Sequence, residues 1–202
     1  MRLLVMASGN GTDFQSIIDA VESGYINAEI VALISDKEGA YALKRAEDHN
    51  IPAYCVPKKK LKNNFYTELM KLVDEINPDG IILAGFITIL NEELVNKYHN
   101  RIINIHPSLI PSFCGKGYYG GNVHKAVIDY GVKYTGCTVH FVDTGADTGP
   151  IILQEVVKVD DNDTPETISN KVLEVEHRLL PYAVKLFTEG RIKIEGRKVK
   201  IL

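Results

Sequence analysis

The fold is best understood from one stretch near the centre of the chain, Arg101-Ile102-Ile103-Asn104-Ile105-His106-Pro107. The segments before it and after it follow different patterns. The apolar run of this stretch predicts a buried strand, in which side chains two residues apart share one face. Asn104 and His106 therefore project together, and Pro107, which lacks a backbone N–H, ends the strand. A carbonyl substrate there would meet an amide donor beside a titratable acid or base, which suits acyl transfer. A histidine held by a loop carbonyl, next to an asparagine that caps a turn, would show the same pattern.

The residues before this strand alternate between short β-rich runs and amphipathic helical runs. This rhythm predicts a mainly parallel, twisted sheet flanked by helices. The expected strands are 3–7, 28–34, 53–56 and 80–84, and the expected helices are 14–21, 40–48 and 65–76. Ligands of such sheets bind outside the carboxyl ends of the strands. Because Ser8-Gly9, Gly85-Phe86 and His106 all lie at such ends, three distant segments should meet at one edge.

The residues after this strand depart from the alternation. The strand-like runs 135–142 and 151–159 are joined by 143–150, which is too short for a helical crossover, so they should pair antiparallel. Thr164 and Pro165 are typical of an N-cap and a first helical residue, and they begin a long helix that should run to about Glu189. The tail 191–202 is expected to form a hairpin. The fold class is therefore α/β, with an antiparallel C-terminal portion.

Composition excludes several classes of protein. The chain has 202 residues, of which 45% are hydrophobic, which is enough for one well-buried globular domain. A net charge of -3 provides no attraction to nucleic acid or to an anionic membrane. No segment is long enough to span a bilayer, and the three cysteines have neither zinc spacing nor a disulfide pattern. We therefore expect a cytoplasmic protein that acts on small molecules.

A glycine-containing loop, Ser8-Gly9-Asn10-Gly11-Thr12, follows the first predicted strand and opens the first predicted helix. Its glycines let backbone N–H groups approach a phosphate, and the helix dipole favours the negative charge. Thr12 is expected to cap the helix, in a capping box with Gln15. A Walker A loop would need Gly-Lys-Ser/Thr, and Phe14 stands where a dinucleotide fingerprint has its third glycine. A tight strand-to-helix turn without a ligand has the same appearance.

Carboxylates in the second half offer further candidates. Glu176 interrupts an apolar helix face, and a buried carboxylate needs either a basic partner in the core or a ligand. Asp143 and Asp147 share the connection 143–150, where aspartates often only shape the turn. This connection lacks the ligand order of a calcium loop, and His124 and His140 lack a metal-binding spacing. We expect no metal, and structural roles for both histidines.

Three segments of the chain resemble the phosphoribosylglycinamide formyltransferases, which are folate-dependent enzymes of purine synthesis. They are residues 8–12, residues 104–111 (Asn-Ile-His-Pro-Ser-Leu-Ile-Pro) and residues 147–152 (Asp-Thr-Gly-Pro-Ile-Ile), and they occur in the family's order. The similarity extends from about Leu3 to about Arg191. It implies a Rossmann-like formyltransferase fold with a single domain, 1–202. Residues 1–100, approximately, would form a phosphate-binding lobe, and about 101–202 the catalytic and folate side.

The resemblance also implies roles for individual residues. The residues expected to be catalytic are Asn104, His106 and Asp147. The residues expected to bind glycinamide ribonucleotide are Gly11, Thr12, Asp13 and Glu176. The residues expected to contact the folate are Lys62, Ile87, Thr88, Ile89, Leu90 and Asn104.

Two of these positions depart from the family's usual pattern. The family usually has asparagine where this chain has Asp13, and often arginine where it has Thr88. A carboxylate about 5 Å from a phosphate charge would repel it by roughly 3 kcal/mol at an effective dielectric constant near 20. We therefore expect the Asp13 side chain to turn away from the phosphate or to be paired.

The expected reaction transfers a formyl group from 10-formyltetrahydrofolate, a cosubstrate, to the amine of glycinamide ribonucleotide in de novo purine biosynthesis. It would yield formylglycinamide ribonucleotide and tetrahydrofolate. Asn104 and a protonated His106 would stabilise the tetrahedral oxyanion, and Asp147 would raise the pKa of His106. No metal, nucleic acid or membrane is needed, and the sequence is compatible with either a monomer or a homodimer.

Two alternatives stay open. One is a folate-dependent formyltransferase that acts on an amino sugar nucleotide, and the other is a noncatalytic nucleotide-binding α/β module. Formyltransferases that act on methionyl-tRNA and hydrolases of formyltetrahydrofolate carry an additional domain, for which 202 residues would leave no room. The glycine-rich segment 115–121 is either a mobile lid over the site or a surface irregularity.

Overall fold

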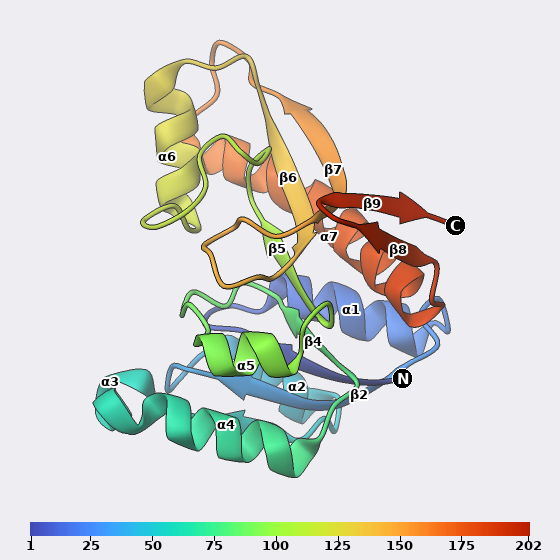
Figure 1. Ribbon diagram of the computed structural model, residues 1–202. Helices are drawn as coiled ribbons and strands as arrows, with labels where there is room; N and C mark the ends of the chain where they lie inside the picture. The colour runs from blue at the N-terminus through green and yellow to red at the C-terminus, as the bar shows by residue number, and fades with distance from the viewer.

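A central sheet with helices on both faces forms the body of the protein, as the computed structural model of residues 1–202 shows (Figure 1). Its seven strands lie in the order β3-β2-β1-β4-β5-β6-β7. The strands are β1 (Arg2–Met6), β2 (Glu29–Ser35), β3 (Ala53–Cys55), β4 (Gly80–Leu83), β5 (Ile102–His106), β6 (Tyr134–Phe141) and β7 (Ile151–Lys158). A separate two-stranded sheet joins β8 (Ile192–Glu195) to β9 (Lys198–Ile201).

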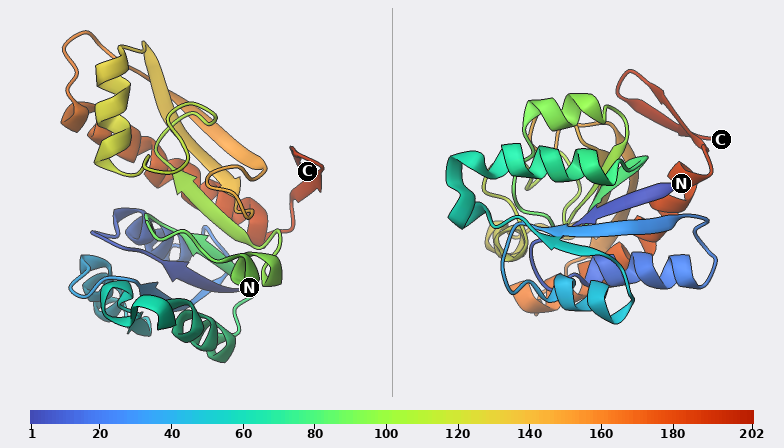
Figure 2. Two further views of the ribbon diagram at one scale, coloured as in Figure 1. Left: turned by 60° about the vertical axis from the view of Figure 1, so that its left-hand side comes forward. Right: turned by 90° about the horizontal axis from the view of Figure 1, so that it is seen from below.

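Seven α-helices and one short 3₁₀ turn connect these strands. The helices are α1 (Thr12–Glu22), α2 (Tyr41–Asp48), α3 (Lys58–Leu61), α4 (Phe65–Ile76), α5 (Glu92–Lys97), α6 (Gly121–Tyr130) and α7 (Pro165–Thr188), and the 3₁₀ turn is Lys62–Asn64. The left view of Figure 2 shows the first half of the chain, coloured blue to green, below the second half, coloured yellow to red. Strand β5 lies between the two halves and belongs to the same sheet as both.

The strand pairing confirms the predicted change of direction. Strands β1 to β5 pair parallel, whereas β6 pairs antiparallel with both β5 and β7. The short connection between β6 and β7 allows only the antiparallel arrangement. The fold class is therefore the predicted α/β class, with a mainly parallel sheet and an antiparallel C-terminal portion.

The alternation of side chains along β1 divides the core into two layers. Leu3 and Val5 point to the face covered by α1, α2, α6 and α7, and Leu4 and Met6 point to the face covered by α4 and α5. All four side chains are fully buried. This explains why the sequence of β1 is a continuous run of apolar residues and does not alternate between apolar and polar ones. Burial of side chains of this size stabilises the fold by about 1.5 to 3 kcal/mol each.

The C-terminal elements also follow the prediction. Thr164 caps α7, since its side chain accepts a hydrogen bond from the Thr167 N–H while the Thr167 hydroxyl accepts one from the Thr164 N–H. Pro181 is accommodated inside α7, and the β8–β9 hairpin turns at Gly196. Helix α7 packs against α1 and β6, and it thereby carries Glu176 into the region behind the glycine loop.

Candidate active site

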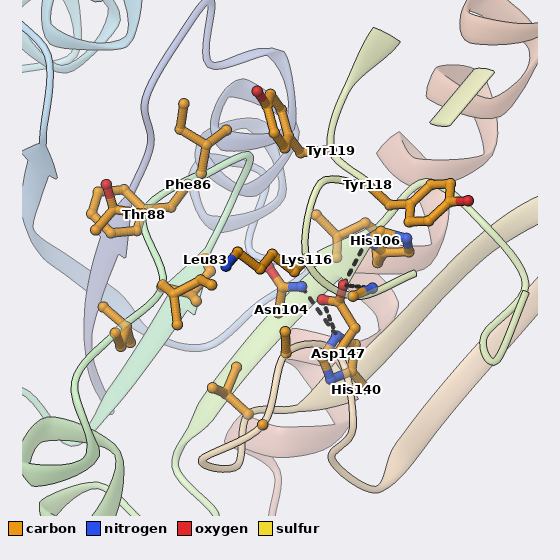
Figure 3. Close-up of a pocket in the computed structure, with 18 of the residues that line it drawn as sticks. Leu83, Phe86, Thr88, Asn104, His106, Lys116, Tyr118, Tyr119, His140 and Asp147 are labelled. Carbon is orange, nitrogen blue, oxygen red and sulfur yellow. Dashed lines mark hydrogen bonds and ion pairs between the residues drawn. The ribbon is translucent and has the colours of Figure 1, made fainter. Parts of the chain in front are cut away.

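A cavity of about 320 Å³ opens at the carboxyl ends of β4 and β5 (Figure 3). Four segments line it, namely 83–90 after β4, 104–107 at the end of β5, 115–120 before α6, and 140–147 after β6. The Ser8 N–H donates to the Gly85 carbonyl, and the Ser8 hydroxyl accepts from the Ile87 N–H. The predicted convergence of three distant strand ends at one edge is therefore confirmed.

Asn104 is oriented by His140, which faces it across the antiparallel β5–β6 pair. The His140 Nδ1 lies 2.8 Å from the Phe141 carbonyl, which can only accept, so this nitrogen carries the proton. In the neutral imidazole, Nε2 then accepts from the Asn104 amide nitrogen, 3.1 Å away. His140 was expected to be structural, but it lies inside the site and fixes the direction of the Asn104 amide.

Asp147 lies between the two histidines of the site. Its Oδ2 accepts a 2.8 Å hydrogen bond from the Gly115 N–H and lies 3.6 Å from His106 Nδ1, while its Oδ1 lies 3.7 Å from His140 Nε2. Burial raises the pKa of Asp147, but the neighbouring imidazoles of His140 and His106 and the hydrogen bond from the Gly115 N–H outweigh it, and the net pKa is lowered. Asp147 is therefore a fixed negative charge beside His106.

His106 is buried, and opposing effects set its pKa. Burial lowers the pKa of His106 more than the Asp147 carboxylate and the Phe113 carbonyl raise it, so the net pKa lies below the ordinary value of 6.5. Its Nε2 lies 3.0 Å from the Phe113 carbonyl and must carry the proton. The lowered pKa favours the neutral imidazole, in which Nδ1 is the nitrogen that faces Asp147.

Asp143 shapes the loop that presents Asp147. Its Oδ1 accepts hydrogen bonds from the Gly145 N–H and the Thr148 hydroxyl, as an aspartate in a turn commonly does. This arrangement leaves Asp143 at the rim of the cavity without a contact to either histidine.

Not all of the residues that were expected to contact folate lie at the cavity. Ile87, Thr88, Ile89 and Leu90 all line it. The Thr88 hydroxyl, however, donates a 2.6 Å hydrogen bond to Asp36, which occupies this side chain with an internal partner. Lys62 is exposed in the 3₁₀ turn and does not line the cavity, so the structure does not bring it to the rest of the predicted site.

The glycine-rich segment forms one wall of the cavity. Residues Gly115 to Gly120 line it, and Lys116 is among the lining side chains that Figure 3 labels. The hydrogen bond from the Gly115 N–H to Asp147 joins the start of this segment to the loop 143–150. These residues are therefore part of the site, which the glycine content alone left undecided.

The glycine loop differs from the prediction in one respect, since Gly11 rather than Thr12 caps α1. Gly11 has a left-handed backbone with φ of 73°, and a Cβ placed on it would lie 2.7 Å from the Ala42 Cβ. Only glycine meets both conditions without strain. Thr12 is consequently the first helical residue, and the backbone N–H groups at the start of α1 stay free to bind an anion.

Asp13 and Glu176 lie near each other where α1 packs on α7. The Glu176 side chain is buried, with 7% of the residue exposed, and one Asp13 oxygen is buried without a hydrogen-bond partner. Burial raises the pKa of Asp13 to about 6, and burial together with the charge of Asp13 raises the pKa of Glu176 well above its usual value. Asp13 has turned away from the loop, 3.9 Å from His177 Nε2.

Two further observations concern metals and membranes. No group of three or more histidine, cysteine, aspartate or glutamate side chains is placed to hold a metal ion. No helix combines the length and the apolar character that crossing a bilayer requires.

Comparisons with known proteins agree with this geometry. A family model described as "Formyl transferase" matches residues 1–184. The chain is 39% identical over 195 residues to the chloroplastic phosphoribosylglycinamide formyltransferase of Arabidopsis thaliana, covering 95% of this chain and 67% of that protein. It is also 39% identical to part of the trifunctional purine biosynthetic protein adenosine-3 of Gallus gallus, and there it spans 96% of this chain but only 19% of the larger protein.

Solved structures give the same assignment. A crystal structure of glycinamide ribonucleotide transformylase 1 from Symbiobacterium toebii superposes with a TM-score of 0.92 at 39% identity, and the match covers 100% of this chain and 94% of that one. The fold, the motifs and the sequence similarity thus extend together over almost the whole chain. The chain belongs to the formyl transferase family, and within it to the phosphoribosylglycinamide formyltransferases.

Proposed function

We propose that the protein transfers a formyl group from 10-formyltetrahydrofolate to the amine of glycinamide ribonucleotide, producing formylglycinamide ribonucleotide and tetrahydrofolate. The observation that carries this proposal is the convergence of Asn104, His106 and Asp147 at the base of one cavity. An amide donor, an imidazole and a carboxylate in this arrangement match the needs of formyl transfer to an amine.

The residues of the cavity have separate tasks in this reaction. Asn104, whose amide is held by His140, donates a hydrogen bond to the formyl oxygen as negative charge develops on it. Neutral His106 accepts the proton that the attacking amine releases, directly or through a water molecule. Asp147, fixed by the Gly115 N–H, stabilises the imidazolium that forms.

The two substrates approach from different sides of this centre. The segment 83–90 offers a largely apolar surface to the folate ring, and the loop at Gly11 and Thr12 offers N–H groups to the acceptor's phosphate. Glu176 lies buried close to the start of α1, and we assign it to the acceptor's polar atoms, whereas Asp13 contributes its backbone rather than its side chain. In this division, residues up to about 100 bind phosphate, and later residues supply the chemistry.

The cellular compartment and the partners of the protein are part of the same proposal. We place it in the cytoplasm, because its three cysteines are free thiols, as is typical of a reducing compartment. Its partners are the two small-molecule substrates.

Acceptor-dependent release of tetrahydrofolate tests the proposal. Purified protein should convert 10-formyltetrahydrofolate only when glycinamide ribonucleotide is present, and an amino sugar nucleotide should not replace it. Turnover with the amino sugar alone would transfer the assignment to that substrate. Release without any acceptor would instead indicate a hydrolase, and absence of every turnover would support a noncatalytic module.

A further inference from the structure

Arg45 of α2 is attached to the glycine loop by three hydrogen bonds, all to uncharged groups. Its Nε donates to the Asn10 carbonyl at 2.9 Å, one terminal nitrogen donates to the Gln15 side-chain oxygen at 3.0 Å, and the other donates to the Asn10 side-chain oxygen at 3.4 Å. A guanidinium carries five N–H groups, so two are unused. The neighbouring Lys44, by contrast, pairs with both Glu47 and Asp48, whereas Arg45 has no carboxylate partner.

The position of Arg45 is fixed by the packing of α2 against the loop. The Ala42 N–H donates to the Gly9 carbonyl, and a Cβ on Gly11 would lie only 3.5 Å from the Arg45 Cδ. Arg45 is half-buried, and its charge lies beside the start of α1. A cation without an ion-pair partner, held close to the start of a helix, is suited to an anion.

A second cavity, of about 410 Å³, lies on this side of the molecule. Its lining contains no hydrophobic residue and consists of Thr12, Gln15, Ser16, Asp19, Arg45 and His177. His177 Nε2 is buried without a hydrogen-bond partner and points to the same region from α7. Burial, and next the charge of Arg45, lower the pKa of His177, which is consistent with the two side chains facing each other.

The charge balance of the loop also calls for a cation. Asp13 is the second residue of α1, and Glu176 lies buried close to it, so any negative charge on these two carboxyl groups would repel a phosphate at the loop. Backbone N–H groups carry only partial charges, and a full positive charge at the loop favours the dianion over a neutral ligand more strongly.

We propose that the Arg45 guanidinium is a specificity-determining contact for the acceptor's phosphate, which it binds with its two unused N–H groups while the start of α1 supplies backbone N–H groups. This inference rests on the proposed function, since it assigns a residue to the phosphate of that acceptor. Arg45 then selects a phosphorylated ribose over the unphosphorylated one, in addition to bracing Asn10 and Gln15.

Calorimetric titration with ribose 5-phosphate tests the contact without formyl transfer. Arg45→Gln should weaken binding by about 10- to 100-fold, as expected for loss of a charge-assisted hydrogen bond, and Arg45→Lys should lie between it and the unaltered protein. Lys44→Gln, which removes the same charge one residue away, should bind normally. Normal binding by Arg45→Gln, or no binding by the unaltered protein, would overturn the proposal.

A kinetic comparison separates phosphate recognition from bracing of the loop. The ratio of kcat/KM for glycinamide ribonucleotide to that for its dephosphorylated riboside should fall in Arg45→Gln, because only the phosphorylated acceptor loses a contact. An equal loss with both acceptors would show that Arg45 only shapes the loop, and would overturn the proposal. Absence of turnover in the unaltered protein would instead reject the formyltransferase assignment, while the ribose 5-phosphate titration would still test Arg45.

Discussion

The amide nitrogen of Asn104 lies 3.1 Å from His140 Nε2, and this contact sets the direction in which the amide can act. His140 is itself fixed by the Phe141 carbonyl, so three groups in sequence determine where an oxyanion would be stabilised. A displacement of about 1 Å in such a donor can reduce a rate by about 100-fold.

Replacing His140 should therefore lower catalysis more than binding. In His140→Leu the Asn104 amide loses its acceptor and can rotate, so kcat should fall by about 10- to 100-fold with a much smaller change in folate affinity. Steady-state kinetics and a folate titration measure the two effects separately. His99→Leu, at an exposed histidine, is the control, and unchanged kcat in His140→Leu would remove this histidine from the account.

The charge of His106 can be measured directly by NMR titration. Burial should keep its pKa below 6.5, and Asp147→Asn should lower that pKa further, because the variant removes the carboxylate that favours the imidazolium. The acid limb of kcat/KM against pH should then move to lower pH in the variant. A pKa above 6.5 in the unaltered protein, or one that Asp147→Asn leaves in place, would contradict the electrostatic argument.

The Asp13 carboxyl predicts a specific dependence of stability on pH. Its pKa rises from 3.8 to about 6 on folding, so the native state favours the neutral carboxyl. Ionisation of Asp13 therefore lowers the free energy of unfolding. This loss is absent below about pH 4, grows as the pH rises, and reaches about 3 kcal/mol above pH 6. Asp13→Asn removes this titration and should raise the free energy of unfolding by up to that amount at pH 7 to 8.

Urea unfolding at a series of pH values measures this effect. The curves of Asp13→Asn and the unaltered protein should converge near pH 4 and separate above it. Asp19 is an exposed aspartate of the same helix, and the curve of Asp19→Asn should stay parallel to that of the unaltered protein at all pH values. A constant difference at all pH values would show that the Asp13 carboxyl is not responsible.

Two glycines of one loop form a matched pair for a stability test. Gly11→Ala places a methyl group 2.7 Å from the Ala42 Cβ on a left-handed backbone, and should destabilise the protein by about 2 to 4 kcal/mol. Gly9→Ala meets no atom within 4 Å and should change stability by less than about 1 kcal/mol. Equal midpoints of unfolding for the two variants would show that the loop is not constrained as described.

Sequence patterns predicted the fold where one local rule applied. The side-by-side projection of Asn104 and His106 follows from the two-residue period of a strand, and the cap at Thr164 follows from its residue types. The antiparallel β6–β7 pair follows from the length of its connection alone. None of these requires knowledge of distant contacts.

The remaining features depend on contacts between distant segments. His140 enters the site because the β5–β6 register places it opposite Asn104, and no spacing in the sequence encodes that register. Gly11 cannot carry a side chain because Ala42, from another helix, leaves no room for one, and a sequence does not show this contact. The pKa of His106 falls rather than rises because burial, which a sequence does not specify, outweighs the attraction of Asp147.

In the proposed mechanism, Asp147 supports the transfer step at Asn104 and His106. The most direct test is the single-turnover rate of formyl transfer to glycinamide ribonucleotide in Asp147→Asn and Asp143→Asn, which remove the same charge from one loop. Asp147→Asn should lose at least about 100-fold in rate, while Asp143→Asn, whose amide oxygen can still accept from Gly145 and Thr148, should stay within about threefold. A normal rate in Asp147→Asn together with a large loss in Asp143→Asn would contradict the account.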